Sequence, residues 1–432
     1  MPQSVVIVGA GCAGTLTAVN LLRNPEGPPR VALVERSGTF GPGVAYGTSD
    51  ERHRLNVAAE RMSAFDDEPA HFARWLQREF GPQPRGAYVR RAHFGAYLRD
   101  LLADAAADAA RAMPARRLER VTGEAVDVET TEDGAAVLLA DGRRLAADHV
   151  VLALGPLPSV APTALPEDPR VIADPWAPGA LAGARDRETS LVVGSGLTGV
   201  DVALSLCGTG PRSRVIAVSR GGCLPFDQLP GLRDAAPAPP PPEDVNVETL
   251  ERWLGRHLRD AQRAGHDWRD AIDGVRPHVQ RLWQSLAVTE RRRFVRQRSR
   301  AWELRRHRMA PETAGQVRDL LADGRLLVRA GRLVAVRALR ETVEVLVSSA
   351  PEELRTLRVD PVVMCTGPGT DVRGTPSRLP RALLAADDRP QPRLHVLGPL
   401  RRGELWETTA VPEIRTQAAT IARAIADEAV RV

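Results

Sequence analysis

Residues 5–14 read Val5-Val-Ile-Val-Gly9-Ala-Gly11-Cys-Ala-Gly14, an apolar run followed by glycines with the spacing Gly-x-Gly-x-x-Gly. The pattern returns at residues 191–199, as Leu191-Val-Val-Gly194-Ser-Gly196-Leu-Thr-Gly199. In this motif the first glycine allows a tight turn out of a strand, the second lets the backbone approach a pyrophosphate, and the third lets the helix pack closely on the sheet. One copy can be a chance loop, but two copies in the same context predict two dinucleotide sites.

The two copies differ in the residue that ends the next strand. After Gly14 the chain reaches a strand at 31–34 that ends in Glu35, about 20 residues on, where a carboxylate would bind a ribose 2′-hydroxyl. The corresponding strand of the second copy, 215–218, ends in Ser219 and Arg220. A hydroxyl and a guanidinium can donate to a 2′-phosphate, which a carboxylate would repel.

These differences assign a ligand to each site. The first site is expected to hold the adenosine half of FAD, through Gly9, Gly11, Gly14 and Glu35. The second is expected to hold NADPH, through Gly194, Gly196, Gly199, Ser219 and Arg220. The alternative for Arg220 is a solvated surface charge.

Composition excludes several kinds of chemistry. The net charge is +5, but aromatic residues make up only 4% and no nucleic-acid module is present, so no nucleic-acid partner is expected. All 59 basic residues are arginine, which excludes Schiff-base chemistry and a lysine general base. No metal-ligand spacing occurs, so no metal is expected. Neither a redox-active disulfide nor a cysteine zinc site is predicted, because no C-x-x-C spacing occurs among Cys12, Cys207, Cys223 and Cys365.

The succession of apolar runs and turns predicts an α/β fold with two Rossmann-like dinucleotide-binding domains, β-meander segments and a helical insertion. We assign residues 1–157 to the N-terminal segment of the FAD-binding domain, 158–370 to the NADPH-binding domain and 371–432 to the C-terminal segment of the FAD-binding domain. Within the NADPH-binding domain, we expect a Pro-rich linker at 235–242 and a helical insert at about 246–321.

Shorter segments refine this division. Residues 121–130, 135–140 and 148–154 have the pattern of strands in a small meander, and 326–364 is also rich in strand patterns. The apolar run at 5–22 lacks a basic flank and contains the phosphate-loop glycines, which argues against a signal or membrane segment. We therefore expect no membrane partner, and a protein of the reducing cytoplasm.

Further motifs extend along nearly the whole chain. They are Gly41-Pro-Gly-Val-Ala-Tyr46-Gly47-Thr48, His53-Arg-Leu55-Asn56-Val57, Met62-Ser63-Ala64, Ser219-Arg220-Gly221, Arg305-Arg-His307-Arg308, Cys365-Thr-Gly367, Leu397-Gly398-Pro399 and Trp406-Glu407-Thr-Thr-Ala-Val-Pro412-Glu413-Ile414-Arg415. Together with the glycine motifs, they resemble the FAD-NAD(P)-binding family of two-dinucleotide flavoproteins, which is related to class B and N-hydroxylating flavin monooxygenases.

The resemblance implies roles for residues at the flavin. Gly398 and the segment 408–413, with Thr408 and Thr409, would lie along the flavin ribitol and pyrimidine edge. A helix starting near Pro412 would stabilise negative charge on the reduced flavin, the alternative being a simple packing helix. Asn56 would hydrogen-bond the reacting oxygen adduct and is the catalytic candidate, the alternative being a turn residue that bonds nearby backbone.

The chain departs from the pattern of the known hydroxylases. Ornithine and lysine N-hydroxylases typically use a lysine near the substrate and a tyrosine after a late Ala-Thr-Gly, whereas this chain has no lysine and carries Pro368 after Gly367. The Phe-x-Gly-x-x-x-His-x-x-x-Trp signature of Baeyer-Villiger enzymes is absent. No named substrate follows from the resemblance.

Residues 291–308 contain nine arginines and one acid, Glu303. One interpretation is a solvated helix face. The other is a substrate-binding element in which a carboxylate or phosphate is held by bidentate bonds, so that the small-molecule substrate bears an acidic group. The residues expected to hold it are Arg276, Arg305, His307 and Arg308.

The leading functional hypothesis is an NADPH-dependent flavin monooxygenase. It would hydroxylate a nitrogen or another heteroatom of a small substrate through C4a-hydroperoxyflavin. Two alternatives stay open at this point. One is an NADPH-dependent flavin reductase or dehydrogenase that passes electrons to a small acceptor or a protein partner, and the other is a nucleotide-binding protein without turnover.

Overall fold

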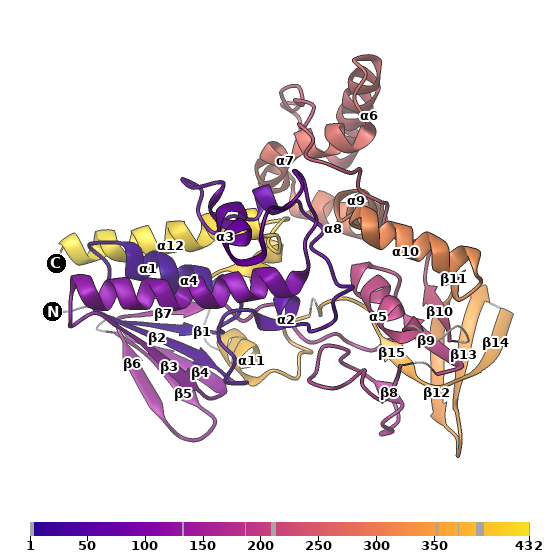
Figure 1. Cartoon of the computed structure of the whole chain (residues 1–432), viewed down its shortest axis with the longest axis horizontal. Helices are drawn as coiled ribbons and strands as arrows, with labels where there is room; N and C mark the ends of the chain where they lie inside the picture. Colours follow the sequence, from indigo (N-terminus) through magenta and orange to yellow (C-terminus); the bar gives the residue numbers. More distant parts are fainter. Residues whose placement is uncertain are drawn as a thin grey trace.

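Two parallel five-stranded sheets lie side by side in the computed structural model, each with helices packed against it (Figure 1). The structure describes residues 4–131, 134–185, 187–208, 213–350, 353–369, 371–385 and 393–431. Two three-stranded antiparallel sheets complete the architecture. The predicted α/β fold with two Rossmann-like units, meanders and a helical insertion is confirmed.

The first parallel sheet has the order β16-β7-β1-β2-β3. Its central strands are continuous apolar runs, as expected for strands buried on both faces. Val5 to Val8 pair in register with Val31 to Val34. The strands are β1 (Ser4–Val8), β2 (Arg30–Glu35), β3 (Arg117–Thr122), β7 (His149–Leu152) and β16 (Leu394–Val396).

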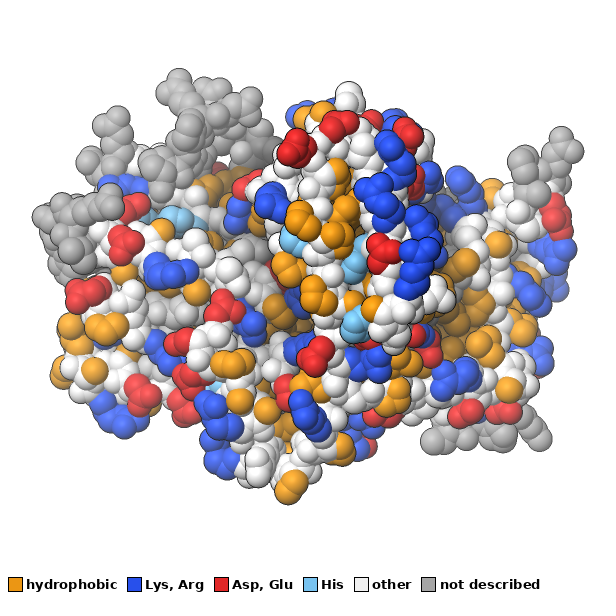
Figure 2. Space-filling view, turned by 90° about the horizontal axis from the view of Figure 1, so that it is seen from above, with side chains coloured by type: hydrophobic (Ala, Val, Ile, Leu, Met, Phe, Trp, Pro, Cys, Tyr) orange, Lys and Arg blue, Asp and Glu red, His pale blue; other side chains and the backbone are white. Residues whose placement is uncertain are grey.

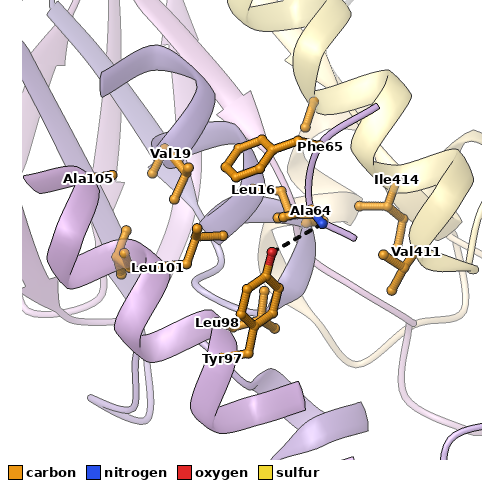
Figure 3. Close-up of a cluster of buried hydrophobic side chains, with 14 of the residues drawn as sticks. Leu16, Val19, Ala64, Phe65, Tyr97, Leu98, Leu101, Ala105, Val411 and Ile414 are labelled. Atoms are coloured by element: carbon orange, nitrogen blue, oxygen red, sulfur yellow. Dashed lines mark hydrogen bonds between the residues drawn. The ribbon is translucent and has the colours of Figure 1, made fainter. Parts of the chain in front are cut away.

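Helices cover one face of this sheet and a meander covers the other. The helices are α1 (Cys12–Arg23), α2 (Gly43–Tyr46), α3 (His71–Phe80), α4 (Arg91–Ala112) and α12 (Val411–Arg431), with a 3-10 helix at Ala59–Arg61. Figure 3 shows side chains of α1, α4 and α12 meeting in one apolar cluster, in which the Ala64 amide donates to the Tyr97 hydroxyl at 3.3 Å. The meander consists of β4 (Ala125–Thr130), β5 (Ala135–Leu139) and β6 (Arg144–Ala147), against which α11 (Arg378–Ala385) packs.

The second parallel sheet has the order β11-β10-β9-β15-β8. Its strands are β8 (Val171–Ile172), β9 (Thr189–Val193), β10 (Arg214–Ser219), β11 (Leu326–Ala330) and β15 (Val362–Met364). One apolar cluster joins it to α5 (Leu197–Cys207) and α10 (Pro311–Ala322). A second cluster joins it to the meander β12 (Arg332–Ala338), β13 (Val343–Ala350) and β14 (Glu353–Val359).

The helical insert projects from the two sheets and contains α6 (Val247–Arg263), α7 (Trp268–Ser285), α8 (Val288–Gln297) and α9 (Ser299–Arg306) (Figure 1). Residues 235–242 contain no helix or strand, as predicted, but they are packed against the insert. The Trp253 indole donates to the Pro240 carbonyl at 3.1 Å, and a Cβ on Gly274 would lie 1.7 Å from the Ala236 oxygen. Basic side chains gather along one edge of the insert (Figure 2).

Two strand predictions are wrong in detail. Residues 121–130 were expected as one meander strand, but β3 ends at Thr122 and joins the parallel sheet, and β4 begins at Ala125 after Gly123. The run at 148–154 also enters the parallel sheet, as β7 beside β1, because it is apolar on both faces. The meander is completed instead by β6. Among the described helices, none is long and apolar enough to cross a membrane.

Candidate functional site

The first glycine loop has the geometry of a phosphate cradle. Gly9 has a φ of +99°, and a Cβ there would lie 2.3 Å from the Ala153 oxygen, while a Cβ on Gly14 would lie 1.8 Å from the Gly9 oxygen. The fold itself therefore requires these two glycines. A Cβ on Gly11 would meet nothing closer than 3.4 Å, so the middle glycine leaves space for a ligand at the N-terminus of α1.

The second glycine loop repeats this arrangement. Gly194 has a φ of +120°, and a Cβ there would lie 2.0 Å from the Cys365 oxygen. A Cβ on Gly199 would lie 2.2 Å from the Gly194 oxygen, whereas a Cβ on Gly196 would meet nothing within 4 Å. In both loops a Cβ on the middle glycine would thus meet no clash, but only Gly196 faces open space, because a Cβ on Gly11 would touch the Gly43 Cα.

The residues that end β2 and β10 contact their loops in chemically different ways. Glu35 Oε2 accepts from the Ala10 amide at 3.0 Å, so a carboxylate lies against the first loop. In the second loop the position of Ala10 is taken by Ser195, whose hydroxyl lies 2.6 Å from the Ser219 hydroxyl and donates to the Cys223 oxygen. Arg220 is exposed and has no ion-pair partner within the described part of the chain. The second loop therefore offers hydroxyl and guanidinium donors without a carboxylate.

The C-terminal segment has a buried hydroxyl without a partner. Thr408 is 1% exposed, and its Oγ1 forms no hydrogen bond to any described residue, which is costly unless a bound group satisfies it. Gly398 has a φ of +79° and its amide donates to Gln417 Oε1 at 3.0 Å, while Thr409 is exposed. The helix predicted near Pro412 is present as α12, which begins at Val411.

Asn56 lies in an anchored loop and keeps its side-chain amide free. It is half-buried, and its side chain forms no hydrogen bond with the residues that the structure describes. The adjacent Leu55 amide donates to the Val89 oxygen at 2.8 Å, which fixes the backbone. The expected alternative, a turn residue bonded to nearby backbone, does not match this geometry.

Two of the four predicted substrate residues are neutralised by protein carboxylates. Arg276 forms bidentate bonds to Glu413 at 2.7 and 2.8 Å. Arg308, which is 2% exposed, bonds both oxygens of Asp273 at 2.7 Å. Arg276 attaches α7 of the insert to α12, and Arg308 attaches the chain after α9 to α7, and this arrangement disfavours the predicted role for both.

The other two predicted substrate residues are not engaged in this way. Arg305 is exposed, with its guanidinium 5.4 Å from the centre of the Phe226 ring. Burial, with a contribution from Arg306, lowers the pKa of His307 to about 4, so its imidazole is neutral at pH 7. A neutral imidazole can bind an acidic group only by a hydrogen bond. A substrate role for Arg305 and His307 stays a prediction.

One residue that was not among the predicted site residues connects this arginine cluster to the C-terminal segment. Arg306, between two of the predicted residues, forms a bidentate ion pair with Glu407, both bonds 2.9 Å long. Gln280 supports the same segment, because it accepts from the Trp406 amide and donates to the Glu407 carbonyl. The signal that pointed to Arg306 was its place in the arginine run, which does not reveal the partner.

The cysteines do not form a redox pair. All four are free thiols, and burial raises the pKa of Cys12 to about 12 and also raises that of Cys365. No group of three or more His, Cys, Asp or Glu that could bind a metal ion occurs among the described residues.

Comparisons with known proteins agree with this geometry. Residues 6–157 match the family described as FAD-NAD(P)-binding. Among solved structures, an ornithine hydroxylase from Pseudomonas aeruginosa is 15% identical with a TM-score of 0.67, and the match covers 98% of this chain and 99% of that one. An ornithine N-hydroxylase from Kutzneria sp. 744 is 17% identical with a TM-score of 0.63, over 99% and 100% of the two chains.

A different enzyme class has the same architecture. Thioredoxin reductase from Lactococcus lactis is 12% identical with a TM-score of 0.52, over 100% of both chains. Among curated proteins, none matches the sequence. At these identities the structural likeness shows the fold alone. Residues 6–157 thus resemble the FAD-NAD(P)-binding family, and the chain as a whole has the fold of the two-dinucleotide-binding flavoproteins.

Proposed function

We propose that this chain is an NADPH-dependent FAD oxidoreductase, and specifically a monooxygenase that oxidises a heteroatom of a small substrate. The observation that carries the nucleotide assignment is the chemical difference between the two glycine loops. Glu35 places a carboxylate against Ala10 in the first, and Ser219 places a hydroxyl against Ser195 in the second. A ribose with a free 2′-hydroxyl suits the first loop, and a 2′-phosphate suits the second.

The residues present fit both cofactors. Gly11 and Gly196, where a Cβ would meet no clash, suit two pyrophosphates, each at the N-terminus of a helix whose dipole favours negative charge. The unpartnered Thr408 hydroxyl suits a polar edge of the flavin. When bound, FAD supplies hydride acceptance and oxygen activation, and NADPH supplies the hydride.

The chain's own side chains would prepare this chemistry. The N-terminus of α12, at the positive end of the helix dipole, would stabilise negative charge on the reduced flavin. Asn56 would donate its free amide to the reacting oxygen, and the insert, fixed by Arg306 and Glu407, would exclude water from the flavin edge. We propose that Arg305 and His307 face the acidic group of the substrate.

The same division into domains is part of the proposal. Residues 1–157 and 371–432 would form the FAD-binding domain, which is supported by the pairing of β16 with β7 in the first sheet. Residues 158–370 would form the NADPH-binding domain, supported by the pairing of β15 with β9.

The competing function is a reductase. Thioredoxin reductase has the same fold, but all four cysteines of this chain are free thiols, so the structure holds no disulfide with which to relay electrons. The test is NADPH oxidation and oxygen uptake in parallel, against a panel of small amines, sulfides and amino acids. We expect one hydroxylated product per NADPH and per oxygen. Rapid electron delivery to a quinone or protein acceptor, without oxygenated product, would overturn the monooxygenase proposal.

A further inference from the structure

A buried polar network joins the loop that carries Asn56 to helix α5 of the second sheet. His53 is 2% exposed, and both of its ring nitrogens are bonded. Nδ1 lies 2.8 Å from Thr48 Oγ1 in its own loop. Nε2 lies 3.0 Å from Ser205 Oγ and 3.2 Å from the Asp201 carbonyl oxygen, both on α5.

The bonding partners determine the tautomer of this histidine. The Asp201 carbonyl can only accept, and Ser205 donates its proton to Asp50 Oδ2 at 2.6 Å, so His53 Nε2 must carry a proton and donate it. Nδ1 then accepts from the Thr48 hydroxyl. His53 is thus a neutral imidazole with every polar atom satisfied, and burial also lowers its pKa.

Charged residues hold both ends of this network. Asp50 is bonded twice by Arg52, at 2.8 Å each, on the loop side. On the helix side, Arg91 forms an ion pair with Asp201 at 2.8 Å, and its backbone amide donates to the His53 oxygen at 2.9 Å. A buried network of this kind, held by ion pairs at both ends, favours one geometry over several.

The network connects the two sites of the proposed function. Helix α5 begins at Leu197, directly after Gly196, where the NADPH pyrophosphate is expected. Ser205 lies on the same helix, and its contact with His53 spans 152 residues of sequence. His53 in turn lies three residues before Asn56 in the anchored loop.

We propose that His53 is a positioning residue that couples nucleotide binding at α5 to the placement of Asn56. A nucleotide that orders the N-terminus of α5 would hold Ser205 and Asp201 in place, and His53 would transmit that order to the loop. The proposal rests on the proposed function only in requiring that NADP⁺ binds at the second glycine loop. Reciprocity of linkage then requires that loosening the loop also weakens NADP⁺ binding.

Hydrogen exchange of the FAD-loaded, full-length protein, with and without NADP⁺, tests this coupling. In the wild type, NADP⁺ is expected to slow exchange in residues 194–199 and, by about fivefold or more, in residues 48–57. Ser205→Ala removes one of the two α5 groups that bond His53 Nε2 and leaves the Asp201 carbonyl, so at saturating NADP⁺ the protection of 194–199 should persist while that of 48–57 is reduced. Thr48→Val, at the other ring nitrogen, should act in the same direction if Ser205→Ala fails to fold.

Thr17→Val is the matched control, because Thr17 is also a buried helix hydroxyl but bonds only within its own helix, to the Ala13 oxygen. It should behave as the wild type. Protection of 194–199 without protection of 48–57 in the wild type would overturn the coupling alone, as would unchanged protection of 48–57 in both variants. No protection of 194–199 in the wild type would overturn the nucleotide assignment and the coupling with it.

Discussion

Arg306 and Glu407 form a bidentate ion pair in which the two side chains are only 8% and 5% exposed. The pair joins the end of α9 to the segment directly before Thr408, so it fixes the insert against the proposed flavin edge. Burial alone would raise the pKa of Glu407, but the charge and hydrogen bonds of Arg306 outweigh it and hold that pKa below its usual value. Both groups are therefore charged at neutral pH.

Breaking this pair on one side should be strongly destabilising. Glu407→Gln leaves the Arg306 charge buried without a counter-ion, and we expect a loss of about 3–5 kcal/mol in unfolding free energy, measured by urea denaturation, together with lower FAD content. The control is Glu404→Gln, which breaks an exposed pair with Arg401 and should cost less than about 1 kcal/mol. Equal effects of the two variants would contradict a buried charge at Glu407.

A bulky side chain in one glycine loop should remove FAD, and in the other it should remove NADPH binding. Gly11→Val places a side chain in the space beside α1, so the purified protein should lose its FAD and its yellow colour. Gly196→Val does the same beside α5, so FAD content should persist while NADPH binding is lost. Each variant is the control for the other, and flavin absorbance with NADPH titration measures both. Full flavin content in Gly11→Val would refute the assignment of the first loop.

The preference for NADPH over NADH should depend on the exposed guanidinium of Arg220, which directly follows β10. Arg220→Ala removes a charge-assisted contact of about 1.5–3 kcal/mol, so the Kd for NADPH should rise about 10-fold to 150-fold while that for NADH hardly changes. Arg292→Ala removes an exposed arginine of α8 and is the charge-matched control. Equal losses for NADPH and NADH in Arg220→Ala would count against a 2′-phosphate at this position.

The sequence predicted those parts of the molecule that depend on local chemistry. Both glycine loops, their flanking strands and the start of α12 follow from turns and apolar runs that a short stretch of chain determines. The placement of residues 121–130 was wrong because only two residues, Gly123 and Glu124, separate a strand of the parallel sheet from a strand of the meander.

Partners that lie far apart in the sequence could not be predicted. Arg276 and Glu413 are 137 residues apart. The sequence does not show that they pair, so either side chain could have been expected to bind a ligand. Likewise, nothing in the sequence indicates that His53 and Ser205 contact each other, because only the fold brings them together. Long-range pairing of charges, rather than the identity of the residues, decides which arginines remain available to a substrate.

We expect the amide of Asn56 to favour substrate oxygenation over release of hydrogen peroxide. Asn56→Ala should leave FAD and NADPH binding nearly unchanged, because the side chain bonds no described residue. Loss of one hydrogen bond of about 1 kcal/mol to the reacting oxygen should raise hydrogen peroxide release severalfold per NADPH consumed. Peroxide assay against NADPH oxidation measures this ratio. An unchanged ratio would remove Asn56 from the oxygen step.

The stability of the protein should respond to pH through His307. Burial lowers the pKa of His307 from 6.5 to about 4, so between these values the unfolded chain binds a proton that the folded chain does not. Stability therefore falls as the pH drops from 6.5 towards 4, by at most about 1.4 kcal/mol per pH unit for this one group, and His307 has no effect above pH 7.

His307→Gln should reduce the difference in unfolding free energy between pH 7 and pH 5, measured by urea denaturation at both values. His266→Gln, at an exposed histidine, should leave that difference as in the wild type. A His307→Gln protein with the wild-type pH dependence would show that this imidazole is hydrated, and it would then be free to take up a proton beside an acidic substrate.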